Sequence, residues 1–190
     1  MKKYVIYYLL FLFAIIFLTS CNYRHKNNNN IIISDTLLTK TISFPNCLLK
    51  LDGNQFQKID SFIFKTEDKT KVISIIDGNC PKCIINQLNN IDSIFNGILH
   101  DDDLLIFILN VSKQDSVFFM RNLQPSIKAT GVILWDSNYN FERQNNLFTP
   151  NANLRTFMVN KKNRIIQYGN PVMKPDVIFE YKEKLKSSIK

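Results

Sequence analysis

Two cysteines separated by two residues, Cys80 and Cys83, form the pattern in this sequence that is best suited to chemistry. Turn residues 77–79 precede them, and Pro81 suits the first position of a helix, where a missing N–H costs nothing. Cys80 is therefore predicted to lie at a helix N-terminus, whose partial positive charge and free N–H groups favour a thiolate. Lys82 adds a full positive charge. Cysteines in such positions have pKa values lowered from about 8.5 to roughly 3.5–7.5.

A thiol of low pKa beside a second thiol is the minimum requirement for thiol–disulfide exchange. We expect Cys80 to be the exposed nucleophile, and Cys83, close enough to form a disulfide with it, to be the resolving thiol. The alternative is an inert disulfide in an exported domain, because disulfides persist in an oxidising compartment.

A zinc site is the least favoured interpretation of the two cysteines. Zinc needs four ligands, whereas the other candidates, Cys47, His25 and His100, show no paired ligand spacing. We therefore predict that no metal binds. Cys47 is interpreted as a small buried core residue and His100, beside three aspartates, as a solvated loop residue.

Hydrophobic periodicity predicts the elements that must position the cysteines. The predicted strands are residues 41–44, 47–51, 72–76, 104–109, 131–135, 155–159 and 165–168. A helix from Pro81 to near Gly97 buries Ile84, Leu88, Ile91 and Phe95. A second helix follows a capping box at 112–115 and ends before Pro125. A short helical turn lies within 141–147. The last helix begins at Pro175 and buries Ile178, Tyr181, Leu185 and Ile189. Two strand–helix crossovers require parallel neighbours, and the late hairpin adds antiparallel strands. The sequence therefore predicts an α/β domain with a central mixed sheet flanked by helices and an N-terminal β extension.

The strand, turn and CxxC helix together resemble the thioredoxin superfamily. The stretch 156–160, TFMVN, followed by a turn and Arg164, resembles a hairpin of its redoxin group, and the resemblance covers roughly residues 70–190. It implies a thioredoxin-like fold and a thiol–disulfide oxidoreductase that uses Cys80 and Cys83 without a cofactor. Its partners would be client protein thiols or disulfides and a redox donor. The alternative function is a non-catalytic binding or scaffold module with a structural disulfide.

The sequence departs from the family around the cysteines. Leu154 or Arg155 stands where the family has a cis-proline, Ser74 where its reductases often have a buried carboxylate, and Asn79 where a tryptophan is common. We therefore expect a trans peptide bond and poor activity on generic disulfides. If Arg155 faces the cysteines, it should favour the Cys80 thiolate and raise the reduction potential above that of thioredoxin.

Two further roles near the cysteines stay open. Asp77 is interpreted first as a turn former and second as a proton relay for Cys80. Arg155 would suit a peroxidase, but the peroxiredoxin pattern Pro-x-x-x-Thr-x-x-Cys is missing before Cys80, so peroxidase activity ranks low.

The N-terminus resembles a bacterial lipoprotein signal. Lys2 and Lys3 precede an apolar run of 15 residues, 4–18, which is short for a membrane span of about 20 residues, and Leu-Thr-Ser leads to Cys21. The resemblance implies cleavage before Cys21 and acylation, including palmitate, of that residue. We predict a signal peptide at 1–20, a flexible asparagine-rich tether at 21–36 that contains His25, and the thioredoxin-like domain at 37–190. The protein would lie in the bacterial cell envelope, most simply the periplasm, and the alternative is an uncleaved anchor helix.

The charge of the chain is compatible with a membrane partner. The net charge of +8 falls to +6 once the signal segment, with its two lysines, is removed. No arginine-rich run or basic–aromatic patch predicts nucleic-acid binding. Weak attraction to anionic lipid headgroups needs no dedicated site. The remaining 170 residues are enough for one domain with its own core, and a monomer is expected.

Overall fold

The structure is a computed structural model that describes residues 38, 40–53, 55–59, 68–77 and 80–188. The predicted signal segment and tether, residues 1–36, lie outside these ranges, and so does Ile189. The described residues belong to one compact unit, Ser34–Lys190. No helix among them is long and apolar enough to cross a membrane.

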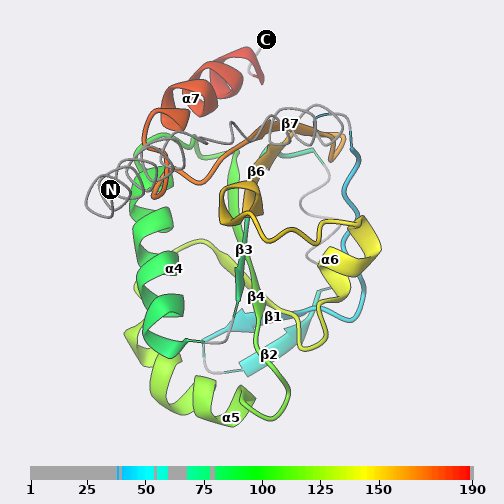
Figure 1. Cartoon of the computed structure of the whole chain (residues 1–190), viewed down its shortest axis with the longest axis vertical. Coiled ribbons are helices and arrows are strands. Elements are labelled where there is room, and N and C mark those ends of the chain that lie inside the picture. Colours follow the sequence, from blue (N-terminus) through cyan, green and yellow to red (C-terminus); the bar gives the residue numbers. More distant parts are fainter. Residues whose placement is uncertain (1–37, 39, 54, 60–67, 78–79, 189–190) are drawn as a thin grey trace, which may run out of the picture. The chain divides into compact units, whose positions relative to one another are not determined.

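The described residues form a seven-stranded mixed sheet in the order β2-β1-β5-β4-β3-β6-β7 (Figure 1). The strands are β1 (Leu49–Asp52), β2 (Gln55–Lys58), β3 (Lys71–Asp77), β4 (Leu104–Asn110), β5 (Val132–Trp135), β6 (Thr156–Val159) and β7 (Ile165–Tyr168). Strands β3, β4 and β5 are parallel, whereas β6, β7, β1 and β2 add antiparallel pairs at the two sides. The predicted topology is therefore confirmed.

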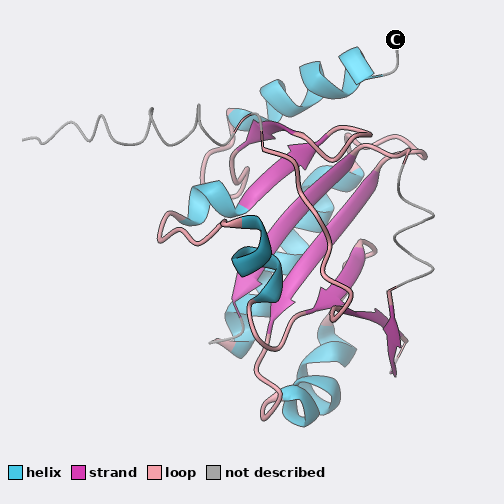
Figure 2. Cartoon of the chain, turned by 90° about the vertical axis from the view of Figure 1, so that its right-hand side faces the viewer, coloured by secondary structure: helices cyan, strands magenta, loops and turns pink. Residues whose placement is uncertain are grey.

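Helices cover both faces of the sheet, which explains why the central strands are almost entirely apolar (Figure 2). The helices are α4 (Pro81–Asn96), α5 (Ser116–Phe118), α6 (Asn140–Asn145) and α7 (Val177–Ser188). Helix α4 buries the four predicted residues, Ile84, Leu88, Ile91 and Phe95, each no more than 1% exposed, in one core cluster with α7. Phe141 of α6 and Leu48 belong to a second cluster, which includes Ile73 and Ile75 of β3.

The N-terminal extension differs from the prediction in two places. Thr41 makes a single bridge to Arg164 instead of starting a strand, and β1 begins at Leu49 rather than at Cys47. A turn precedes β1, with the Leu48 N–H donating to the Pro45 carbonyl at 3.2 Å. Leu48 takes the buried position, so the prediction that Cys47 is a core residue is wrong, because its side chain is exposed.

The helical stretch after β4 also differs from the prediction. Ser112 Oγ accepts the Asp115 N–H at 3.2 Å, as the predicted capping box requires, but Asp115 accepts from the Ser112 hydroxyl at 2.6 Å, and the N-cap of α5 is Asp115 and not Ser112. However, α5 is only three residues long, and it passes into a π-helical turn, η1 (Phe119–Leu123), and a 3₁₀ turn, η2 (Gln124–Ser126). Pro125 is tolerated there because the first turn of a new helical segment needs no N–H donor.

The starts of helix α7 and strand β6 differ from the predicted starts by one or two residues. Helix α7 begins at Val177, two residues after Pro175, and its buried residues are Val177, Tyr181 and Leu185, with Ile178 half-buried. Strand β6 begins at Thr156, because Arg155 ends a 3₁₀ turn, η3 (Ala152–Arg155). Arg155 therefore lies in the loop that leads into β6.

Candidate active site at the carboxyl edge of the sheet

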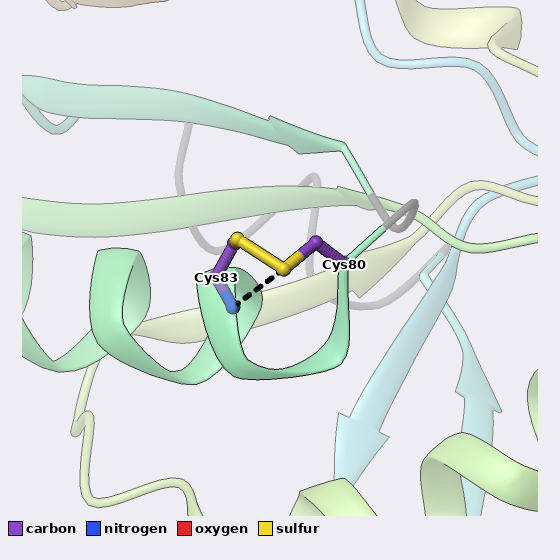
Figure 3. Close-up of a disulfide and its surroundings, with 2 residues drawn as sticks. All are labelled: Cys80 and Cys83. Carbon is purple, nitrogen blue, oxygen red and sulfur yellow. Dashed lines mark hydrogen bonds between the residues drawn. A yellow bond between two sulfur atoms is a disulfide. The ribbon is translucent and has the colours of Figure 1, made fainter.

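Cys80 is the N-cap residue of α4, three residues after the end of β3. Its backbone is extended, with φ −137° and ψ 107°, Pro81 occupies the first turn, and the Cys83 N–H donates to Cys80 Sγ at 3.3 Å (Figure 3). A disulfide joins Cys80 to Cys83, whose Cα atoms are 5.1 Å apart. No acidic residue lies in the first turn, and Lys82 is exposed there. The predicted helix start and disulfide are confirmed, and the surroundings favour a thiolate after reduction.

The sequence predicts that Cys80 is the exposed cysteine of the pair, and the structure shows the reverse. Cys80 is half-buried, whereas Cys83 is exposed. Access to solvent therefore favours reaction at Cys83, while the helix terminus favours ionisation of Cys80. Since the thiolate and not the thiol is the nucleophile, the two effects oppose each other and can be separated by experiment.

Four polar side chains gather at the carboxyl ends of the parallel strands, and we call them the carboxylate cluster: Asp77, Asn110, Glu142 and Arg155. Asp77 and Asn110 are register partners that end β3 and β4. The Asn110 amide donates to Glu142 Oε2 at 2.6 Å and to Asp77 Oδ1 at 3.4 Å. Arg155 forms an ion pair with Asp77 and lies 3.7 Å from Glu142 Oε1.

Glu142 is the buried carboxylate of this cluster, with a side chain that is 0% exposed. Burial raises the pKa of Glu142 above its usual value, and Asp77 and Asp136 raise it further, whereas the Asn110 hydrogen bond and Arg155 lower it. Its Oε1 atom has no hydrogen-bond partner among the described residues. Because Glu142 is buried, its protonation state affects the free energy of unfolding. Glu142 also lies in the same cluster as Asp77, which is three residues from Cys80.

Arg155 does not act as a free cation near Cys80. Its guanidinium faces Asp77 and Glu142, so two carboxylates compensate its charge. Arg155 should therefore favour the Cys80 thiolate less than an unpaired cation would, and the expected rise of the reduction potential stays a prediction. Asp77, in turn, is bonded to Arg155 and Asn110, so its carboxylate belongs to the cluster. Its role in the turn stays a prediction, because residues 78 and 79 lie outside the described ranges.

The loop that leads into β6 is built without a proline next to the strand. Asn151 caps η3 by accepting the Asn153 N–H at 3.0 Å, and Leu154 packs against the second core cluster. The described residues contain no cis peptide bond, which confirms the expected trans geometry at Leu154 and Arg155. A cavity of about 600 Å³ lies beside this loop. Its lining includes Asp77, Gln87, Arg155, Val172 and Met173.

No protein-family model and no curated protein matches this chain. Solved structures do match. An uncharacterized thioredoxin-like protein from Porphyromonas gingivalis is 18% identical, with a TM-score of 0.51, over 78% of this chain and 93% of that chain. The mitochondrial 2-Cys peroxiredoxin from Plasmodium falciparum is 16% identical, with a TM-score of 0.52, over 80% and 94%. The thioredoxin domain of a thiol-disulfide oxidoreductase from Bacteroides vulgatus is 10% identical, with a TM-score of 0.50, over 77% and 96%. The chain has a thioredoxin-like fold.

The thioredoxin-like fold does not by itself select a reaction. The matched structures include both a disulfide oxidoreductase and a peroxiredoxin. Function must therefore be argued from the residues at the site. On this fold, the Cys80–Cys83 disulfide lies at the carboxyl edge of the parallel strands, where loops converge and ligands commonly bind in open α/β sheets.

The other candidate residues from the sequence are not part of this site. His100 is exposed at the opposite edge of the thioredoxin-like sheet, where its N–H donates to Asp103 at 3.1 Å. Cys47 is a free, exposed cysteine. Within the described ranges, no three histidine, cysteine or acidic side chains group closely enough to hold a metal ion.

Two members of the carboxylate cluster, Asn110 and Glu142, were missed by sequence reasoning. Asn110 carried a usable signal, because it is the polar residue that ends the apolar strand β4, the parallel neighbour of β3. Glu142 carried none, since it lies in a short polar helix whose inward face is set only by the tertiary packing of Phe141.

Proposed function

We propose that this chain is a thiol–disulfide oxidoreductase of the bacterial cell envelope, anchored to a membrane by lipid on Cys21. The observation that carries the redox proposal is the position of Cys80. Its sulfur caps the N-terminus of α4 and accepts the Cys83 N–H, so the same groups can stabilise the thiolate after reduction.

The reaction follows from the pairing of the two sulfurs. In the reducing direction, the Cys80 thiolate attacks one sulfur of a client disulfide, forms a mixed disulfide and releases a client thiolate, which takes up a proton. Cys83 then loses its proton and attacks Cys80 Sγ. This step breaks the mixed disulfide, releases the second client sulfur and closes the Cys80–Cys83 disulfide. Two electrons pass to the client, and a dithiol donor must return them before the next cycle.

The cavity beside the η3 loop suggests where part of a client would lie. It joins the Asp77–Arg155 ion pair to Val172 and Met173, which are 43% and 60% exposed. Its lining includes Gln87, one helical turn beyond Cys83. A client segment with an apolar side chain next to a polar one would match this lining.

The envelope location rests on the N-terminal sequence and on the chemistry of the disulfide. The apolar run is short for a membrane span, it ends at Leu18, three residues before Cys21, and a stable disulfide suits an oxidising compartment. Replacement of Cys21 by serine should abolish acyl labelling and release the protein from membranes. A variant that stays fully in the membrane fraction would show that residues 4–18 are an anchor helix.

Trapping of clients separates the enzyme from a scaffold with an inert disulfide. In a Cys47→Ser background, which removes the exposed third thiol, Cys83→Ser should accumulate mixed disulfides between Cys80 and client proteins. The matched control, Cys80→Ser together with Cys83→Ser, should accumulate none. If the Cys83→Ser variant traps no more protein than this control, the disulfide is structural and the enzymatic proposal fails.

A further inference from the structure

The opposite edge of the sheet, about 20 Å from Cys80 along β3, carries a concentrated positive charge. A cavity of about 560 Å³ lies between the β6–β7 turn and α7. Among the described residues, its lining includes Lys161, Lys162, Arg164 and Lys184 but no acidic side chain. All four of these basic side chains are exposed. We call them the basic corner. Nothing in the redox mechanism uses it.

The turn that presents the basic corner is held in one conformation. Asn160 Oδ1 accepts the N–H groups of Lys162 and Arg164, each at 3.0 Å, and Asn163 has a left-handed φ of 57°. Beneath the turn, the buried Lys71 ammonium donates to Asn163 Oδ1 at 2.9 Å. Lys71 is 1% exposed and also donates to the Lys69 carbonyl at 2.8 Å, so it ties the turn to the start of β3.

The chain enters the domain at this same turn. The Ile42 N–H donates to the Asn163 carbonyl and the Ile165 N–H donates to the Lys40 carbonyl, both at 2.8 Å. Lys40, the start of the first continuous described range, is therefore held beside the basic corner. In Figure 1 the first described residues, β7 and α7 lie at the top, and α5, which follows the carboxyl end of β4, lies at the bottom.

We propose that the basic corner docks the domain onto the anionic lipid surface to which the N-terminus is attached. This inference rests on the lipid anchor at Cys21 in the proposed function. Lys40 is the nineteenth residue after Cys21, so the turn can be no more than about 65 Å from the membrane, even with the tether fully extended. Each basic side chain close to an anionic surface strengthens binding about fivefold.

The charges around the basic corner also determine how the domain would tilt. On α7, Glu183 pairs with Lys186, and Glu180 accepts from Gln167. Asp101 and Asp103 line a different cavity, on the β4–β5 side of the same edge. An anionic surface would attract the β6–β7 side and repel the β4–β5 side. The disulfide, at the carboxyl edge, would then face away from the membrane and be open to clients.

Lysine footprinting of the full chain tests this docking. The protein is purified from bacterial membranes and reconstituted into vesicles of phosphatidylcholine alone or with one third phosphatidylglycerol. It is then acetylated, and mass spectrometry measures the acetylation rate at each lysine. At about 0.05 M salt, anionic vesicles should slow acetylation of Lys162 and Lys184 about fivefold relative to neutral ones, and about 0.5 M salt should remove the difference. Lys82 and Lys113 should react equally in both vesicles.

A pair of charge-reversal variants provides the matched control. Lys161→Glu with Lys162→Glu should restore the Lys184 rate to its value in neutral vesicles, whereas Lys113→Glu with Lys128→Glu should leave the protection intact. Equal rates at every lysine in both vesicles, or protection of Lys82 instead, would overturn the docking. Disulfide exchange is assayed on the same vesicles. If the protein exchanges disulfides but its lysines are not protected from acetylation, only the docking proposal fails. If the lysines are protected but no disulfide exchange occurs, only the oxidoreductase proposal fails.

Discussion

The two edges of the sheet carry charge in different ways. At the carboxyl edge, Arg155 is packed between Asp77 and the buried Glu142, so its charge is compensated within the fold. At the amino edge, Lys161, Lys162 and Arg164 are exposed on a hydrogen-bonded turn. Buried, paired charges influence stability and pKa, whereas exposed ones influence salt-dependent binding and contribute little to stability. Substitutions at the two edges should therefore have different kinds of effect.

Loss of one charge at each edge should give the largest contrast. Arg155→Leu leaves Asp77 and Glu142 facing each other without a cation, and we expect it to lower the free energy of unfolding by about 2 kcal/mol at pH 7. Lys162→Leu should change it by less than about 0.5 kcal/mol, because this side chain is exposed. Urea unfolding followed by circular dichroism measures both. Equal effects would show that the carboxylate cluster is not a stabilising unit.

The buried carboxylate should give the carboxyl edge a pH dependence of stability. The pKa of Glu142 is raised by burial, so the folded protein holds this proton more tightly than the unfolded chain does. The stabilisation is complete below the unfolded pKa, near 4.5, and is lost as pH rises through the folded pKa. Relative to Glu142→Gln, the wild-type protein should therefore become less stable as pH rises above 4.5.

Unfolding free energies measured from pH 4 to 8 check this sign. Glu183→Gln is the matched control, since Glu183 is 72% exposed and pairs with Lys186 along the surface of α7. The unfolding free energy of this control should change with pH in the same way as that of the wild type. A Glu142→Gln curve that also runs parallel to the wild type would mean that Glu142 keeps an ordinary pKa in the folded protein.

The smallest predicted effect is on the pKa of Cys80, and its sign depends on which member of the Asp77–Arg155 ion pair is replaced. Asp77 is three residues from Cys80, so their Cα atoms are within about 11 Å. At that distance and an effective dielectric constant of about 40, one charge contributes about 0.8 kcal/mol, or about 0.6 of a pKa unit. Asp77→Asn should lower the Cys80 pKa in the reduced protein and raise the reduction potential by about 15–20 mV, because the thiolate is stabilised.

Arg155→Gln should shift both quantities in the opposite direction, since it removes the cation of the same pair. The thiolate absorbance near 240 nm, titrated in a Cys47→Ser background, measures the pKa, and equilibration with glutathione buffers measures the potential. Shifts of the same sign in the two variants would indicate a change in local structure in place of an electrostatic effect.

The redox pair and its supporting elements could be predicted because their signals are local. The apolar run of β3, the proline after Cys80 and the periodic residues of α4 all lie within 26 residues, 71–96. The carboxylate cluster could not be predicted, because Asp77 meets Arg155 across 78 positions and Asn110 meets Glu142 across 32. The exposure of Cys47 depends on the turn that directs Leu48, and not Cys47, into the core. The shift from α5 into η1 follows from no local pattern that we recognise.

The central claim is that the helix terminus, and not exposure, makes Cys80 the nucleophile. It is tested most directly by the rate at which each thiol of the reduced protein reacts with iodoacetamide from pH 5 to 9, read by mass spectrometry. Cys80 should react fastest at neutral pH, with an apparent pKa below 8, although Cys83 and Cys47 are the more exposed. Faster alkylation of Cys83, or equal rates at all three cysteines with apparent pKa values near 8.5, would contradict the account.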